Sequence, residues 1–185
     1  PARFFLYAEV PLTPLCALVA SLGEAPPLRD RDAVYVIDGE GTVVLVLGSF
    51  PGAASLRAQQ YYAHPQNHFW RILQALWPQH PLPGPQDYAG RRAWLLARGL
   101  GLWDVYAACE REGSLDTHIR NAEVNDFARL RTCCPLLSAI VHNGGESFRH
   151  ARASAQLGVP VLRLPSTSPA NASWSFERKR AAWGE

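Results

Sequence analysis

Four short apolar runs recur along the chain, and none of them alternates apolar with polar residues. They lie at residues 42–47, 100–104, 138–142 and 159–164. Unbroken runs of this length are typical of strands that are buried on both faces, as in a parallel sheet.

Segments with helical spacing separate these runs. The predicted helices lie at residues 15–22, 69–76, 87–98, 125–131, 146–156 and 173–183. Asn125 and Ser173 are expected to cap two of them. Strands that alternate with helices join through right-handed crossovers. The pattern therefore predicts an α/β fold: a three-layer α/β/α sandwich with a central, mainly parallel sheet of four strands.

Two further segments complete the predicted chain path. The run at 33–37, the turn at 38–41 and the strand at 42–47 have the pattern of a hairpin. The polar residues 110–120 are expected to form an excursion over the surface.

Length and composition favour one globular domain over residues 1–185, in which residues 1–30 form an N-terminal helix and linker. Hydrophobic residues make up 48% of the chain and the formal net charge is +2. This charge excludes a strongly basic arm and is compatible with a local patch for nucleic acid.

The four cysteines are Cys16, Cys109, Cys133 and Cys134, and no two have Cys-x-x-Cys spacing. They are expected to be reduced, mostly buried thiols of a cytoplasmic protein, without a metal ion or other cofactor. A cluster held by cysteines from distant positions is the alternative. A glutamate and two prolines interrupt the apolar N-terminal stretch, so we expect neither a signal peptide nor a membrane span.

Ligands of an open parallel sheet bind beyond the carboxyl ends of its strands. Amides, hydroxyls, aromatic rings and one carboxylate follow the predicted strands, at 48–52, 104–106, 142–145 and 165–171. These residues suit a flat, uncharged, hydrogen-bonding ring. The glycine-rich phosphate loops and the Gly-x-Ser-x-Gly elbow are absent from the sequence.

The first and last of these loops carry the strongest patterns. Gly48-x-x-Pro-Gly52 makes a stiff turn with approachable amides, although an ordinary strand-to-helix turn would look the same. Residues 165–171 carry three hydroxyls before a basic helix. They predict a clamp on a nucleic-acid backbone, or else a solvated surface loop.

Together with Tyr62-Ala-His-Pro-Gln-Asn67-His-Phe-Trp70, these loops resemble motifs of the uracil-DNA glycosylase superfamily, above all its hypoxanthine-DNA glycosylase branch. The resemblance covers roughly residues 30–183. It implies a monofunctional, monomeric enzyme that needs no cofactor. Such an enzyme flips a deaminated base, chiefly hypoxanthine, out of DNA and cleaves its N-glycosidic bond.

Some residues depart from other branches of the superfamily. Ser49 and Phe50 stand where uracil-specific members place Asp or Asn, and Leu164 stands where active uracil enzymes carry His. Robust uracil excision is therefore not expected. A mismatch-specific uracil/thymine glycosylase and a non-catalytic nucleobase-binding module remain the alternatives.

The resemblance assigns roles to residues of the predicted rim. Asn67 would hold the attacking water, or would instead cap the helix that follows. Tyr62 would stack on the flipped base and Phe50 would cover its other side, although either ring could belong to the core.

Asp104 would accept a hydrogen bond from N1–H of hypoxanthine and reject adenine, or would cap a helix. His142 and Asn143 could donate to the base, with a structural role as the alternative for His142. Gly48 and Ser49 would bind the base. The residues expected to contact DNA, by holding phosphates or by wedging into the stack, are Ser166, Thr167, Ser168, Pro169 and Asn171.

Overall fold

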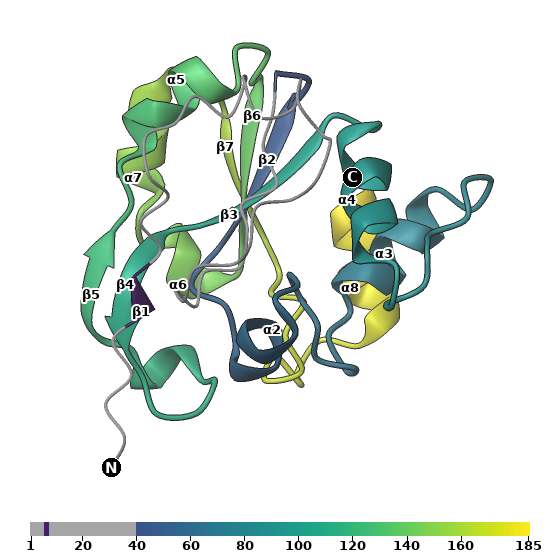
Figure 1. The fold of residues 1–185 in the computed structure, drawn as a ribbon, viewed down its shortest axis with the longest axis horizontal. Coiled ribbons are helices and arrows are strands. Elements are labelled where there is room, and N and C mark those ends of the chain that lie inside the picture. The colour runs from purple at the N-terminus through teal and green to yellow at the C-terminus, as the bar shows by residue number, and fades with distance from the viewer. Residues whose placement is uncertain (1–5, 8–39) are drawn as a thin grey trace.

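The computed structural model describes residues 6–7 and 40–185. Four parallel strands form the central sheet, in the order β3-β2-β6-β7 (Figure 1). Their bounds are β2 Val44–Gly48, β3 Leu100–Asp104, β6 Ala139–Asn143 and β7 Val161–Leu164. All four strands were predicted from the apolar runs, and the α/β architecture with a parallel centre is confirmed.

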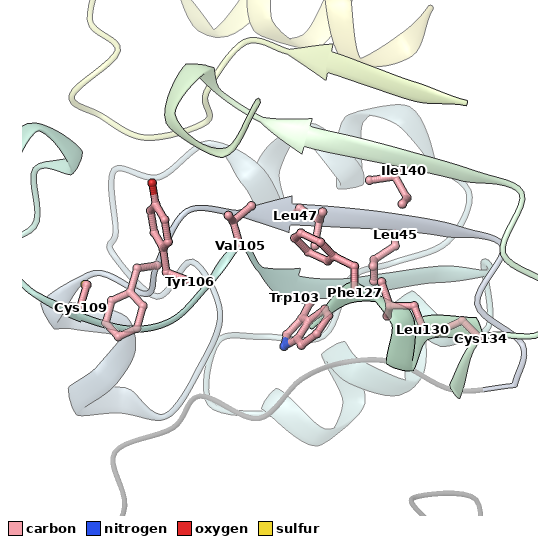
Figure 2. Close-up of a cluster of buried hydrophobic side chains, with 11 residues drawn as sticks. Leu45, Leu47, Trp103, Val105, Tyr106, Cys109, Phe127, Leu130, Cys134 and Ile140 are labelled. Carbon is pink, nitrogen blue, oxygen red and sulfur yellow. The ribbon is translucent and has the colours of Figure 1, made fainter. Parts of the chain in front are cut away.

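The strands β2, β3 and β6 are buried on both faces, which explains why they lack polar alternation, whereas Leu162 and Arg163 of the edge strand β7 are exposed. Leu45 and Leu47 contribute to one hydrophobic cluster, together with Trp103 and Ile140 (Figure 2). Val46, which points to the opposite face, belongs to a second cluster. Because these three β2 residues are at most 3% exposed, an alternating polar position would have placed a polar group in a core.

Helices cover the sheet on two sides, as Figure 1 shows. One side carries α3 (Phe69–Leu76), α4 (Tyr88–Leu96) and α8 (Phe176–Gly184), and the other carries α5 (Leu130–Cys133), α6 (Gly145–Phe148) and α7 (Ala151–Ser154). A further short helix, α2 (Ala53–Ala58), follows β2 and was not predicted. The layers place the carboxyl ends of all four strands at one edge.

A second, antiparallel sheet was also missed. It has the order β1-β4-β5, with bounds β1 Leu6–Tyr7, β4 Tyr106–Glu110 and β5 Arg120–Val124. The predicted excursion at 110–120 is its connection and includes the short helix η1 (Asp116–His118). Every residue of β5 is exposed, so this strand carries no hydrophobic periodicity that a sequence could reveal.

Several predicted helix ends were wrong. Asp126, and not Asn125, caps the turn η2 (Phe127–Arg129) by accepting a hydrogen bond from Ala128. Ser175, and not Ser173, caps α8. The predicted helix 146–156 is broken into α6, α7 and η3 (Ala155–Leu157).

The predicted helix 15–22, the N-terminal linker and the first strand of the predicted hairpin lie outside the described residues. Within the residues that the structure describes, no helix is long and apolar enough to cross a membrane. The same residues contain no group of three or more side chains arranged to hold a metal ion.

Candidate active site

The carboxyl ends of the strands form one polar rim, at the edge of the sheet where α2 lies (Figure 1). In the sheet register Gly48 pairs with Asp104, and Asn143 pairs with Leu164. The loops that follow these strands therefore start side by side. The predicted convergence of four strand ends on one edge is confirmed.

Thr167 joins the last loop to the loop that carries Asn67. Its carbonyl accepts a hydrogen bond from the His68 amide at 3.0 Å. Its own amide donates to Asn143 Oδ1 at 2.9 Å, and Asn143 Nδ2 donates to the Thr167 hydroxyl at 3.0 Å. Thr167 is fully buried, so these bonds form a closed connection between three loops of the rim.

The rest of the last loop is held by its own polar groups. Ser166 Oγ accepts from the Ser168 amide, and Asn171 Nδ2 donates to the Ser166 carbonyl. Lys179, the only lysine in the chain, is 1% exposed and donates from Nζ to the Ser168 carbonyl at 3.0 Å. The loop is thereby fixed to α8 while Ser166, Ser168 and Pro169 remain partly exposed.

Asn67 stands two residues before Phe69, the first residue of α3, and is half-buried. Its Oδ1 accepts a hydrogen bond from the Phe69 amide at 2.9 Å, so Asn67 caps the first amide of α3 from the position before the N-cap residue His68. A capping role was the alternative that the sequence left open. An amide oxygen has two acceptor sites. The cap therefore orients the Asn67 side chain and leaves its oxygen able to accept a second hydrogen bond.

Tyr62 packs between the rim and the core. Its ring lies against Phe69, with 4.3 Å between the centroids, and its buried hydroxyl lies near Gly48. The φ angle of 54° is unusual for a residue with a side chain, and it turns the ring inward. Burial raises the pKa of Tyr62 well above its ordinary value, so the hydroxyl keeps its proton.

Asp104 is 6% exposed at the end of β3. Burial raises the pKa of its carboxyl to about 7, while a hydrogen bond with Tyr61 and the nearby Arg111 charge oppose the increase. No helix begins here, because β4 starts at Tyr106, so the alternative role of Asp104 as a helix cap is wrong. A side chain on Gly48 would overlap the Asp104 carboxyl, which explains the need for glycine at position 48.

Ser49 and Phe50 have structural contacts in the first loop. Ser49 Oγ donates to Asp116 Oδ1 at 2.7 Å. Phe50 is 8% exposed and belongs to the same hydrophobic cluster as Leu47, with the Arg111 guanidinium 5.4 Å above its ring. The structure thus places Phe50 in the core, as the alternative reading of this residue anticipated.

The side chains that hold the first loop in place were not identified from the sequence. The Arg111 side chain is 5% exposed and donates to the carbonyls of Phe50 and Pro51. Its guanidinium lies 4.0 Å from the Asp116 carboxylate. Ser114 accepts a hydrogen bond from the Ala53 amide at the start of α2. All three side chains belong to the polar span whose proximity to the loop becomes visible only in the fold.

His142 is fully buried at the end of β6. Nδ1 lies 2.7 Å from Ser147 Oγ and Nε2 lies 2.9 Å from Ser154 Oγ, so both ring nitrogens have partners. Burial lowers the pKa of His142 to about 4, which keeps the ring neutral at neutral pH. These contacts match the structural alternative for His142.

The sequence of residues 36–185 matches the family model of the Uracil DNA glycosylase superfamily. The chain therefore belongs to this superfamily. It is 37% identical over 150 residues to a hypoxanthine DNA glycosylase of Methanosarcina barkeri. The matched region covers 81% of this chain and 92% of that relative. A hypoxanthine DNA glycosylase of Methanosarcina acetivorans is 38% identical over 143 residues, or 76% of this chain and 87% of the relative.

A solved structure has the same fold. It is the solution NMR structure of a Methanosarcina acetivorans protein designated a uracil DNA glycosylase. The two structures superpose with a TM-score of 0.68 at 34% sequence identity, over 81% of this chain and 94% of the other.

Arg111→Met should lower the free energy of unfolding by about 1–3 kcal/mol, because two carbonyls of the first loop lose a buried donor. Denaturant titration measures this change. Arg120→Met is the matched control, since Arg120 is exposed and also donates to two carbonyls. Equal stability of the two variants would show that Arg111 does not brace the loop.

Asp104 should make stability depend on pH. Its folded pKa of about 7 exceeds the ordinary 3.8, so the folded protein binds the extra proton between these values. The free energy of unfolding should therefore fall as pH rises from about 4 to about 7. Denaturant titrations should show that Asp104→Asn lacks this fall. The variant should therefore become more stable relative to wild type as the pH rises over this range. A pH-independent difference would contradict the assignment.

Proposed function

We propose that this protein is a DNA glycosylase that hydrolyses the N-glycosidic bond of deoxyinosine and releases hypoxanthine. The observation that carries the proposal is the connection between His68 and Thr167, which brings two motif loops together at one rim. Two relatives named hypoxanthine DNA glycosylase, each matched over most of its length, support the choice of base.

In the proposed reaction the bond between the sugar's anomeric carbon and the base breaks, and its electron pair leaves with the base. The sugar becomes oxocarbenium-like, so a weakly nucleophilic water suffices if it is held in place. The free acceptor site of Asn67 Oδ1 would hold that water under the sugar. The water adds to the anomeric carbon, and the proton it releases neutralises the departing base anion, which leaves free hypoxanthine and an abasic site.

Asp104 would read the base. Its carboxylate accepts a hydrogen bond from N1–H of hypoxanthine, whereas adenine presents a lone pair at N1 and is repelled. Uracil also offers an imide N–H, so Asp104 alone does not separate hypoxanthine from uracil. The Tyr62 ring and hydroxyl border the same position above Gly48 and would set the size of the base that fits.

The hydroxyls of Ser166 and Ser168 would contact phosphates beside the flipped nucleotide, with Pro169 and Asn171 facing the vacated stack. Thr167 is fully buried, so its proposed role is to position this loop. His142 and Phe50 also have buried structural contacts, so their proposed role is likewise to support the site.

A lyase step is not part of the proposal. Such a step needs an amine that reaches the sugar and forms a Schiff base. Lys179 is the only lysine in the chain, and its Nζ is buried against the Ser168 carbonyl. This placement supports a monofunctional hydrolase.

An oligonucleotide duplex with one deoxyinosine tests the function. Purified protein followed by alkali should break the strand at the lesion, and a uracil duplex run in parallel tests the alternative substrate. Asn67→Ala should lower the single-turnover rate by about 10²-fold or more, because the water loses its position.

The Asn67→Ala change also removes a helix cap, which costs about 1 kcal/mol of stability. Asp87→Ala is the matched control, since Asp87 caps α4 away from the rim. Wild-type protein that binds the duplex and leaves it intact would end the proposal. Equal rates for Asn67→Ala and Asp87→Ala would show that Asn67 has no role in the reaction.

The pH profile tests the role of Asp104. If its carboxylate reads N1–H, the excision rate should rise with pH through about 7, as the carboxyl loses its proton. Asp104→Asn should lack this rise. Single-turnover rates from about pH 5 to about pH 9 measure both profiles. A wild-type profile that the substitution leaves unchanged would contradict base reading by Asp104.

A further inference from the structure

An open groove of about 450 Å³ lies beside the rim, between α3, α4 and the start of α8. It is lined by Trp70, Arg71, Gln74, Ala75, Leu82, Pro83, Gly84, Arg91 and Phe176. The lining contains two guanidinium groups and no carboxylate. None of these residues takes part in the proposed hydrolysis.

Both guanidiniums are held in place by aromatic rings. Arg71 lies over Phe176, with 4.6 Å from Cζ to the ring centroid, and Arg91 lies over Trp70 at 4.9 Å. Arg91 Nε also donates to the Pro83 carbonyl at 2.9 Å. Neither arginine forms a salt bridge with another residue of the described chain. Two positioned cations that form no salt bridge within the described residues favour a polyanion such as DNA.

The groove lies close to the candidate active site. His68 stands next to Asn67 in the chain, and its ring contacts Phe176 at 5.4 Å between centroids. Arg71 lies in the first turn of α3, the helix that begins two residues after Asn67. The helices α3 and α8 run side by side with their first residues toward the rim (Figure 1).

The charges around the groove agree with an anionic occupant. Glu177 lies in the first turn of α8, is exposed and interacts electrostatically with Arg71. Hydrogen bonds at the start of α8 lower the pKa of Glu177, and the charges of Arg180 and Arg71 add to this effect. Arg178 adds a further guanidinium nearby, stacked on Trp174 at 4.4 Å.

We propose that this groove binds the DNA backbone beside the flipped nucleotide, with Arg71 and Arg91 each paired to a phosphate. The inference rests on the proposed function for the identity of the ligand. It adds a second contact surface, separate from the hydroxyl loop at 166–168, and it makes affinity depend on the length of DNA that flanks the lesion.

Fluorescence anisotropy with labelled duplexes tests this proposal. Wild-type protein should bind a duplex of about 21 base pairs with central deoxyinosine more tightly than one of about 9. Arg71→Gln and Arg91→Gln should each weaken binding of the long duplex by about five- to tenfold and reduce the salt slope by about 1, since each removes one phosphate contact. The double variant should lose the advantage of the longer duplex.

Two further variants serve as controls. Arg152→Gln changes an exposed arginine on α7, on the other side of the sheet, and should bind both duplexes as wild type does. Arg71→Lys keeps a positive charge over the groove and should retain the salt slope, even if the altered ring contact lowers stability. Thermal unfolding of each variant identifies losses that come from the fold.

The outcomes separate the two proposals. Excision by wild type, with both groove variants binding like Arg152→Gln, would overturn the groove and leave the proposed function standing. Weakened binding by the groove variants, with no excision by wild type on any base, would support the groove and end the proposed function.

Discussion

The hydrogen bonds around Thr167 hold together parts of the rim that come from distant positions in the sequence. Asn143 ends β6, Thr167 follows β7 and His68 precedes α3, and the three are joined through one buried residue. A buried amide and a buried hydroxyl without partners would each cost stability. The bonds therefore allow only a narrow set of loop positions, and the place of the neighbouring Asn67 is set by the same contacts.

The first loop is fixed by a different kind of interaction. Gly48 lets the backbone of β2 approach the carboxyl of Asp104, and Arg111 reaches across from the second sheet to two carbonyls of the loop. The antiparallel sheet thus supports the site without supplying a strand to the central layer. A rim held on one side by buried hydrogen bonds and on the other by a buried guanidinium is preorganised before any ligand arrives.

The sequence predicted β2, β3 and β6 because both of their faces are buried, and it predicted the partly exposed edge strand β7 from its apolar run. It predicted most of the rim because the ends of parallel strands share one edge. It missed β5, whose residues are exposed, and it missed the brace made by Arg111 and Asp116. Those contacts join positions about 60 residues apart, which local periodicity cannot register. For Phe50 the sequence left both readings open, and its packing within the hydrophobic cluster favours the core.

Asp104 is the point where stability and the proposed chemistry oppose each other. A carboxyl that is 6% exposed would pack more favourably as an uncharged group, and its raised pKa is the consequence of that burial. The Tyr61 hydrogen bond and the Arg111 charge offset part of the cost, so the group titrates near neutrality. Arg111 then has two effects, because the guanidinium that braces the first loop also favours the ionised form of Asp104. A substitution at Arg111 that leaves the loop folded would still move the pH at which a base with N1–H is recognised.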